Sequence, residues 1–214
     1  MSKPQAILLL GPTGSGKTPL GELLQARGLG TVRCLHFDFG ERLRQIADGR
    51  LEVAELAADD LAFVADILDR GALLEDKHFH IAETILRSFI SERKSGPGDW
   101  IILNGLPRHV GQADDVDHLV EVRTVIELAC TPATVLARLS ANAGGDREGR
   151  VDDHPARVER KLELYAARTE PLLAHYRLHG AEVITVNVRP DTTAEEIHRD
   201  LPARDLGHNP NTPQ

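Results

Sequence analysis

The stretch that decides the fold is Gly11-Pro12-Thr13-Gly14-Ser15-Gly16-Lys17-Thr18, which follows the apolar run Ala6-Ile7-Leu8-Leu9-Leu10. It matches the pattern G-x-x-x-x-G-K-[ST] at every fixed position. Glycines let the backbone wrap tightly, so that several N–H groups point inward at one phosphate group, and a helix that begins near Lys17 adds the positive end of its dipole. In such a loop the lysine reaches the β- and γ-phosphates, and the hydroxyl of Thr18 ligates Mg²⁺. The stretch therefore predicts a buried strand, a phosphate-binding loop and a helix that together bind a nucleoside triphosphate.

The composition is that of a globular protein with one sizeable core. The chain has 214 residues, of which 41% are hydrophobic and 27% charged. A net charge of −8 argues against a nucleic-acid or acidic-membrane partner, because a row of phosphates requires a basic face. Cys34 and Cys130 lie far apart, so neither a zinc site nor a disulfide framework is indicated. The N-terminus runs directly into the first strand and no apolar run has the length of a membrane span, so we expect a cytoplasmic protein without a signal peptide.

Strand and helix patterns alternate along the rest of the chain. Short apolar or β-branched runs predict four further strands, at residues 31–36, 100–103, 124–130 and 181–188. Helical spacing of apolar residues predicts helices after residue 17 and at residues 40–47, 73–90, 132–139, 154–178 and 193–201, with short amphipathic segments at 52–57 and 59–69. We therefore expect an α/β fold, a three-layer sandwich with a five-stranded parallel sheet between two layers of helices.

Several motifs beyond the loop resemble those of the adenylate kinase family of nucleoside monophosphate kinases. The match runs from about residue 6 to about residue 197, with the motifs in the same order and at similar intervals. Gly40-Glu41-Arg42-Leu43-Arg44 resembles the family's G-D-x-L-R helix, and residues 69–76 resemble its G-x-L-V-x-D turn. Asn104-Gly105-Leu106-Pro107-Arg108, followed by Gln112-Ala113, resembles D-G-F-P-R and Q-A. Gly149-Arg150-Val151-Asp152-Asp153, with Tyr165 and Thr169-Glu170-Pro171, resembles the short form of the family's lid.

The resemblance implies a reaction, its cofactors and its site residues. The reaction is transfer of the γ-phosphoryl group of ATP, the co-substrate, to a nucleoside monophosphate, with Mg²⁺ as cofactor and AMP as the first acceptor to consider. The family's arginines, here Arg44 and Arg108, hold the acceptor phosphate because a planar guanidinium binds two phosphate oxygens and stays charged. Gln112 is expected to hydrogen-bond the acceptor base. The expected catalytic residues are Lys17, Arg108, Arg150 and Lys161. The expected ATP site consists of residues 11–18 and Arg147, and the expected acceptor site of Asp38, Phe39, Arg44, Gly105, Arg108 and Gln112.

The resemblance also predicts how the chain is divided. Residues 1–201 form one domain, with a helical insertion that binds the acceptor at about residues 37–70 and a short lid at about residues 141–153. Residues 202–214 contain prolines, Asn and Gly and little to bury, so we expect a mobile tail. Nucleotides are the expected small-molecule substrates, with no nucleic-acid or membrane partner, and we expect a monomer.

The lid departs from the family pattern at two arginine positions. Gly144 stands where the family has the first arginine of the lid, and Lys161 stands where it has an arginine on the following helix. Arg147 and Arg160 lie close by in the sequence and could substitute for them. Since lysine lacks the fork of arginine, we expect slower transfer or different contacts at this site.

Three further departures concern the acceptor and the metal. Phe39 stands where the family has a small residue beside the acceptor base, so it could stack on a base or partly fill the pocket. Asn104 replaces the acidic residue that helps to hold Mg²⁺ at the end of the third strand. Asp38 ends the neighbouring strand, where it could supply the missing carboxylate beside Thr18 or could simply cap the helix that begins at Phe39. From the residues alone, both interpretations of Asp38 are open.

Two other functions remain open at this point. One is a kinase that phosphorylates a hydroxyl of a small metabolite, as the shikimate and gluconate kinases do, because Asp38 resembles the strand-end aspartate of those enzymes. The other is a non-catalytic regulator that closes on ATP and transfers nothing. Arg108 and Gln112, where the family binds the monophosphate, favour the monophosphate kinase.

Overall fold

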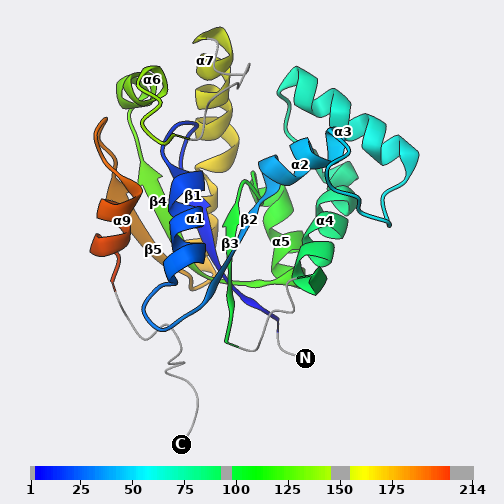
Figure 1. Cartoon of the computed structure of the whole chain (residues 1–214), viewed down its shortest axis with the longest axis horizontal. Coiled ribbons are helices and arrows are strands. Elements are labelled where there is room, and N and C mark those ends of the chain that lie inside the picture. The colour runs from blue at the N-terminus through cyan, green and yellow to red at the C-terminus, as the bar shows by residue number, and fades with distance from the viewer. Residues whose placement is uncertain (1–2, 93–97, 146–154, 203–214) are drawn as a thin grey trace, which may run out of the picture.

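The sheet has five parallel strands, as the sequence predicts. The computed structural model describes residues 3–92, 98–145 and 155–202, and the side chains of these except Pro155 and Ala156. Its strands are β1 (Gln5–Leu10), β2 (Cys34–Asp38), β3 (Trp100–Asn104), β4 (Glu121–Ala129) and β5 (Glu182–Asn187). They lie in the order β2-β3-β1-β4-β5, and every pair is parallel (Figure 1). All strands therefore end at the same edge of the sheet, where open α/β sheets bind their ligands.

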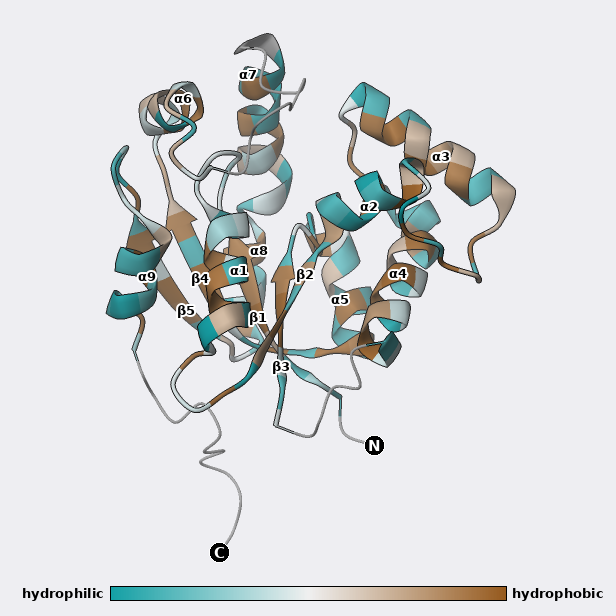
Figure 2. Cartoon of the chain, in the orientation of Figure 1, coloured by the Kyte–Doolittle hydropathy of each residue, from teal (hydrophilic) through white to brown (hydrophobic). Residues whose placement is uncertain are grey.

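Helices cover both faces of this sheet. On one face lie α1 (Lys17–Arg27) and α9 (Ala194–Asp200); on the other lie α4 (Phe79–Glu92), α5 (Val110–Leu119) and α8 (Leu172–Leu178). Successive residues of β1 alternate between the two cores, because side chains along a strand point to opposite faces. Strands that are buried on both sides need apolar residues throughout, which is why the run 6–10 is entirely apolar. Figure 2 shows the hydrophobic residues gathered on the strands and on the inner faces of the helices.

The remaining helices stand above the carboxyl edge of the sheet. On one side are α2 (Phe39–Ala47) and α3 (Ala58–Arg70), which lie within the predicted acceptor-binding insertion. On the other side are α6 (Pro132–Ser140) and α7 (Pro155–Leu164), which continues into a π-helical turn, η3 (Tyr165–Thr169) (Figure 1). Most of the predicted lid and nearly all of the predicted tail lie outside the described residues. Of the helices within the described part of the chain, none is long and apolar enough to cross a membrane.

Several predicted boundaries were wrong. The second strand begins at Cys34 rather than at residue 31, because Leu29 and Val32 exchange two backbone hydrogen bonds in a tight turn. The helix predicted over residues 73–90 begins only at Phe79, after an extended segment and a short 3₁₀ turn, η1 (Asp76–His78). Residues 52–57 are not helical.

Two further differences concern helices. The helix predicted over residues 154–178 is interrupted between η3 and α8, where Pro171 has no N–H to donate to a continuous helix. Helix α5 was not predicted, since its buried stripe consists of only Ala113, Val116 and Leu119 beside the polar Gln112. It follows directly on the segment that carries Arg108, so it fixes where that segment ends.

Candidate active site

The loop between β1 and α1 has the backbone that a phosphate site requires. Gly11 has a φ of 151°, and a Cβ at that position would lie 2.6 Å from Ser15 Oγ and 2.8 Å from the carbonyl oxygen of Leu128. Gly16, at the N-cap of α1, has a φ of 100°. Both conformations require glycine in practice, which explains two fixed positions of the motif. The loop residues Gly11, Pro12, Thr13, Gly14, Gly16, Lys17 and Thr18 line one cleft, whereas Ser15 is buried beneath it.

The ammonium group of Lys17 lies across this loop. Its Nζ donates to the carbonyl oxygens of Gly11, at 2.7 Å, and of Pro12, at 2.8 Å. The positive charge is thus held over the mouth of the loop, beside the N-terminus of α1. A phosphate group that entered here would meet the ammonium and the first N–H groups of the helix together.

Asp38 contacts both the phosphate-binding loop and helix α2. Its Oδ2 accepts a hydrogen bond from Thr18 Oγ1 at 2.7 Å and another from Asn104 Nδ2 at 2.8 Å. Asn104 Nδ2 also donates to Thr18 Oγ1, at 3.1 Å. The other oxygen, Oδ1, accepts from the backbone N–H of Glu41 at 2.9 Å and caps α2. The structure therefore realises the cap and the placement beside Thr18 at once, one on each carboxylate oxygen.

Two arginines, Arg44 and Arg108, line the same cleft on the side of α2 and β3. Arg44 projects from α2 and pairs with Glu41 at 3.0 Å, and Arg108 follows β3. Surrounding protein atoms lower the pKa of the Arg108 guanidinium by desolvation; Asp38 opposes this shift, and the like charge of Arg44 adds to it. Two cations that repel each other across a cleft are stabilised when an anion enters between them. The pair is therefore suited to bind an anion in the same cleft that the phosphate-binding loop lines.

Gln112 lies beside Arg108 and does not line the cleft. Only 1% of its surface is exposed. Its amide oxygen accepts from the backbone N–H of Arg108 at 3.0 Å, and its amide nitrogen donates to the carbonyl oxygen of Leu74 at 2.7 Å. The sequence predicted that Gln112 hydrogen-bonds the acceptor base. In the structure its amide instead links the Arg108 backbone to the segment after α3. It acts here as a positioning residue.

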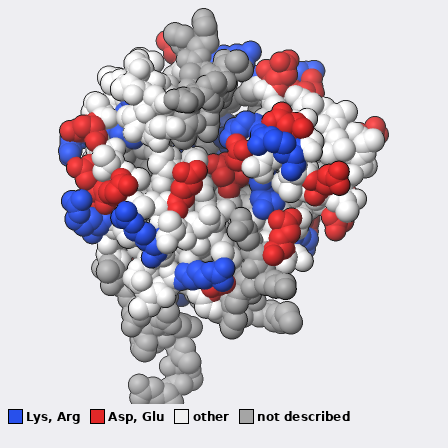
Figure 3. All heavy atoms as spheres, viewed as in Figure 1, with Lys and Arg blue, Asp and Glu red and all other residues white. Residues whose placement is uncertain are grey.

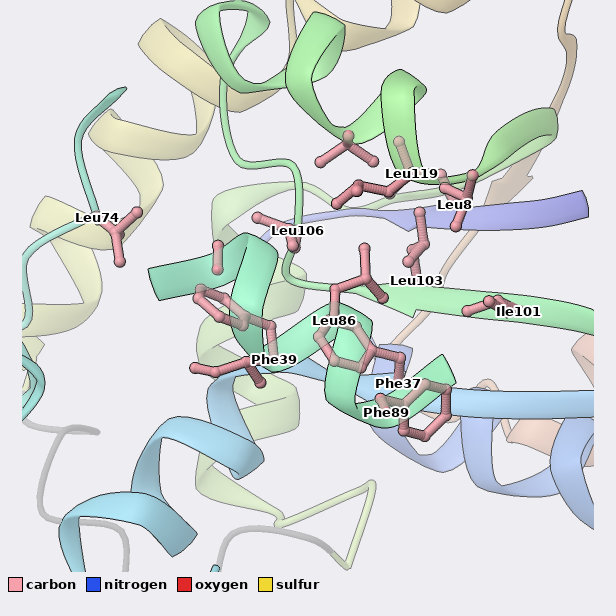
Figure 4. Packing of buried hydrophobic residues seen from close by; sticks show 14 of the residues in the cluster. Leu8, Phe37, Phe39, Leu74, Leu86, Phe89, Ile101, Leu103, Leu106 and Leu119 are labelled. Carbon is pink, nitrogen blue, oxygen red and sulfur yellow. The ribbon is translucent and has the colours of Figure 1, made fainter. Parts of the chain in front are cut away.

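The inner wall on the acceptor side is apolar. Phe39 is 3% exposed and stacks on Phe37, with ring centroids 6.2 Å apart. It lines the cleft near Gly105, and Figure 4 shows it in the packed cluster that also contains Leu106. The ring therefore belongs to the core as much as to the cleft, which leaves little freedom for it to move aside for a base.

Helix α7 and the turn η3 close the cleft from the lid side. Lys161, Tyr165 and Thr169 line it. Thr169 Oγ1 donates to the carbonyl oxygen of Arg108 at 2.7 Å, and Arg168 pairs with Glu75 at 3.1 Å. The predicted lid residues Arg147 and Arg150 lie outside the described residues. Arg160 is exposed on α7, and Gly144 lies in the turn after α6; neither lines the cleft.

One side chain that contacts the phosphate-binding loop, Arg138, was not predicted from the sequence. Arg138 in α6 is 4% exposed, and its Nε donates to the carbonyl oxygen of Gly14 at 2.9 Å. Its Nη1 donates to the carbonyl oxygens of Arg189, at 2.9 Å, and Thr192, at 2.8 Å. The side chain thus ties the phosphate-binding loop to the segment before α9. Its position three residues after Val135, on the apolar stripe of α6, was the signal that could have found it.

Charge is unevenly placed around the cleft. Figure 3 shows lysine and arginine side chains gathered beside the hollow in the upper centre of this face, with acidic side chains among them. Lys17, Arg44, Arg108 and Lys161 line the cleft. Although the net charge of the chain is −8, this cleft suits anionic ligands.

Comparisons with known proteins agree with this geometry. A family model described as "AAA domain" matches residues 7–161. The chain is 32% identical to an adenylate kinase of Parasynechococcus marenigrum (strain WH8102), over 89% of this chain and 93% of that protein. It is also 32% identical to adenylate kinase 1 of Synechocystis sp., over 84% and 87% of the two chains. Among solved structures, a gluconokinase from Sinorhizobium meliloti 1021 matches with a TM-score of 0.52 at 16% identity, over 93% of this chain and 90% of that one, which is a likeness of fold.

Proposed function

The chain belongs to the adenylate kinase family of P-loop kinases, and we propose that it transfers the γ-phosphoryl group of ATP to a nucleoside monophosphate, with AMP as the first acceptor to test. The observation that carries the proposal is a single cleft with two anion sites. The phosphate-binding loop with Lys17 forms one, and Arg44 with Arg108 forms the other. A kinase that joins two polyanions needs these two sites side by side.

The side chains of this cleft act by position and charge. The loop N–H groups and Lys17 hold the β- and γ-phosphates of ATP, while Arg44 and Arg108 hold the phosphate of the acceptor in line with them. Lys161 approaches from α7 and adds positive charge where the transferring group is most negative. Mg²⁺, when bound, supplies neutralisation of the phosphates, and Thr18 with Asp38 offers it oxygen atoms.

One observation favours a second candidate function, a kinase that phosphorylates a hydroxyl group of a small metabolite. Asp38 places a carboxylate oxygen in the cleft beside Thr18, where it could take the proton of an attacking hydroxyl. That oxygen already accepts two hydrogen bonds. Arg44 and Arg108 also match the doubly charged phosphate of a nucleoside monophosphate better than the single carboxylate of gluconate or shikimate. The monophosphate acceptor therefore accounts for more of the cleft.

An acceptor panel tests the proposal. The protein is incubated with ATP, Mg²⁺ and each of AMP, CMP, UMP, GMP, dTMP, gluconate and shikimate, and ADP formation is followed. We expect turnover with at least one nucleoside monophosphate and none with the two hydroxyl compounds. Lys17→Ala, which removes the ammonium group over the loop, is the matched inactive control. Turnover with a hydroxyl compound alone would support the second candidate, and ATP binding without transfer to any acceptor would identify a regulator.

A further inference from the structure

We propose that the metal-facing carboxylate of this kinase lies on β2 rather than on β3, so that Asp38 supplies the negative charge that holds Mg²⁺ and its waters beside Thr18. Asn104, at the end of β3, then serves to orient Asp38. The inference rests on the proposed function only in that both require Mg²⁺ and ATP in this cleft. It concerns ATP and metal binding, and it holds for any acceptor.

The strand register places the two residues side by side. Asp38 and Asn104 are direct partners in the parallel pairing of β2 with β3. Moving a carboxylate from one to the other shifts it sideways by one strand, about 4.8 Å, without moving it along the sheet. Both side chains still reach the same hydroxyl, since Thr18 Oγ1 lies 2.7 Å from Asp38 Oδ2 and 3.1 Å from Asn104 Nδ2.

The direction of the hydrogen bonds assigns different roles to the two residues. Asn104 turns its N–H groups, rather than its oxygen, toward Thr18 and Asp38. A flipped amide would bring its oxygen against the carboxylate oxygen of Asp38, so the carboxylate itself determines this orientation. An N–H donor cannot ligate a cation, whereas a carboxylate and a hydroxyl are ligands that Mg²⁺ prefers. Asp38 is therefore the residue of this pair that suits the metal.

Three hydrogen bonds hold the Asp38 carboxylate in place. Oδ1 caps α2 through the N–H of Glu41, and Oδ2 accepts from Thr18 and Asn104. A side chain held in this way loses little further conformational entropy when a cation arrives. Asparagine caps a helix about as well as aspartate does, so Asp38→Asn removes the charge and keeps the cap.

The metal is expected to arrive with the nucleotide. Within the described ranges no group of three or more His, Cys, Asp or Glu side chains is placed to hold a metal ion. Thr18 and Asp38 alone give too few ligands, and phosphate oxygens and water must complete the shell, as is usual for Mg²⁺. The measurement must therefore follow ATP binding with and without Mg²⁺, because the ion alone is not expected to bind.

The test is isothermal titration calorimetry with ATP, without any acceptor, in the presence of Mg²⁺ and in its absence. The wild type is compared with Asp38→Asn, with Asp38→Asn/Asn104→Asp, and with Asp200→Asn, which removes one charge from the exposed end of α9. We expect Asp38→Asn to reduce the gain in ATP affinity due to Mg²⁺ by roughly tenfold or more, within the usual range of coupling between two ligands. The double variant returns the charge one strand away and restores most of the gain. Asp200→Asn behaves as the wild type.

Two further measurements make the outcome decisive. Thermal unfolding shows that the variants fold, and electron paramagnetic resonance of Mn²⁺ with ATP reports metal capture directly. A full Mg²⁺ effect in Asp38→Asn, or an equal loss in the single and the double variant, overturns the proposal. A separate titration with AMP distinguishes the alternative: if Asp38→Asn weakens AMP binding and leaves the Mg²⁺ effect unchanged, the proposal is overturned and Asp38 serves as counter-ion to Arg108. A wild type that binds ATP with Mg²⁺ but transfers nothing contradicts the proposed function and leaves this inference standing.

Discussion

Replacing Arg138 by methionine tests whether a buried cation braces the phosphate-binding loop. Three short hydrogen bonds are lost, to the carbonyl oxygens of Gly14, Arg189 and Thr192. Each bond from a charged donor contributes about 1.5–3 kcal/mol, and such losses are less than additive because the remaining groups relax. Methionine keeps the aliphatic stem of the side chain. We therefore expect a loss of about 3–5 kcal/mol in the free energy of unfolding, which lowers the melting temperature by roughly 6–20 °C in a domain of this size.

The assay is thermal unfolding followed by circular dichroism, combined with titration of ATP. Arg138→Lys keeps the charge and can reach only some of the carbonyl oxygens, so we expect an intermediate melting temperature. Arg177→Met, an exposed residue of α8, is the matched control and should change stability by less than about 0.5 kcal/mol. ATP affinity should fall in Arg138→Met, since Gly14 loses its partner. If Arg138→Met and Arg177→Met have the same melting temperature, Arg138 does not stabilise the loop as argued.

Three other outcomes follow from the structure. Arg108→Ala should raise the KM for the acceptor by roughly ten- to a hundredfold, because a bidentate charged contact is lost, while calorimetry finds ATP binding nearly unchanged; an effect on ATP alone would contradict the assignment. Gly11→Ala should abolish ATP binding in a folded protein, because the added Cβ meets the Leu128 carbonyl oxygen at 2.8 Å; normal binding would show that the loop adjusts. Arg168 holds the pKa of Glu75 below its ordinary value by a hydrogen bond, so this pair stabilises the protein above the ordinary glutamate pKa. That stability, below about 1 kcal/mol for so exposed a pair, should disappear as the pH falls through the lowered pKa, and Glu75→Gln should lack this pH dependence in unfolding titrations.

Much of the fold could be predicted because its signals are local. The run 6–10 is apolar throughout since β1 is buried on both faces, and the loop after it contains glycines where the backbone has φ values of 74–151°. The positions of the five strands followed from short apolar runs between turns. The ends of the strands were less predictable. Strand β2 begins only at Cys34, where its backbone pairs with β3, and the sequence around residue 31 does not reveal where that pairing starts.

The residues of the candidate site were also predictable only in part. The residues of the phosphate-binding loop and the two arginines of the acceptor side were found from motifs, and the structure brings them into one cleft. Gln112 was found as well, but its amide is occupied by Leu74, which lies 38 positions earlier in the chain. Arg138 was not found, because its partners are backbone carbonyls of two distant segments that carry no residue pattern.

The nucleotide-binding loop and the parallel α/β sheet were predictable without the structure, since a loop motif and an apolar period are properties of neighbouring residues. The contacts of Asp38, in contrast, are visible only in the folded structure. The residue reads equally well as a helix cap and as a metal partner, and it is the pairing of β2 with β3 that brings its second oxygen to Asn104 and Thr18. Those contacts join residues 66 and 20 positions apart, and long-range contacts of this kind depend on the order and register of strands, which local patterns do not encode.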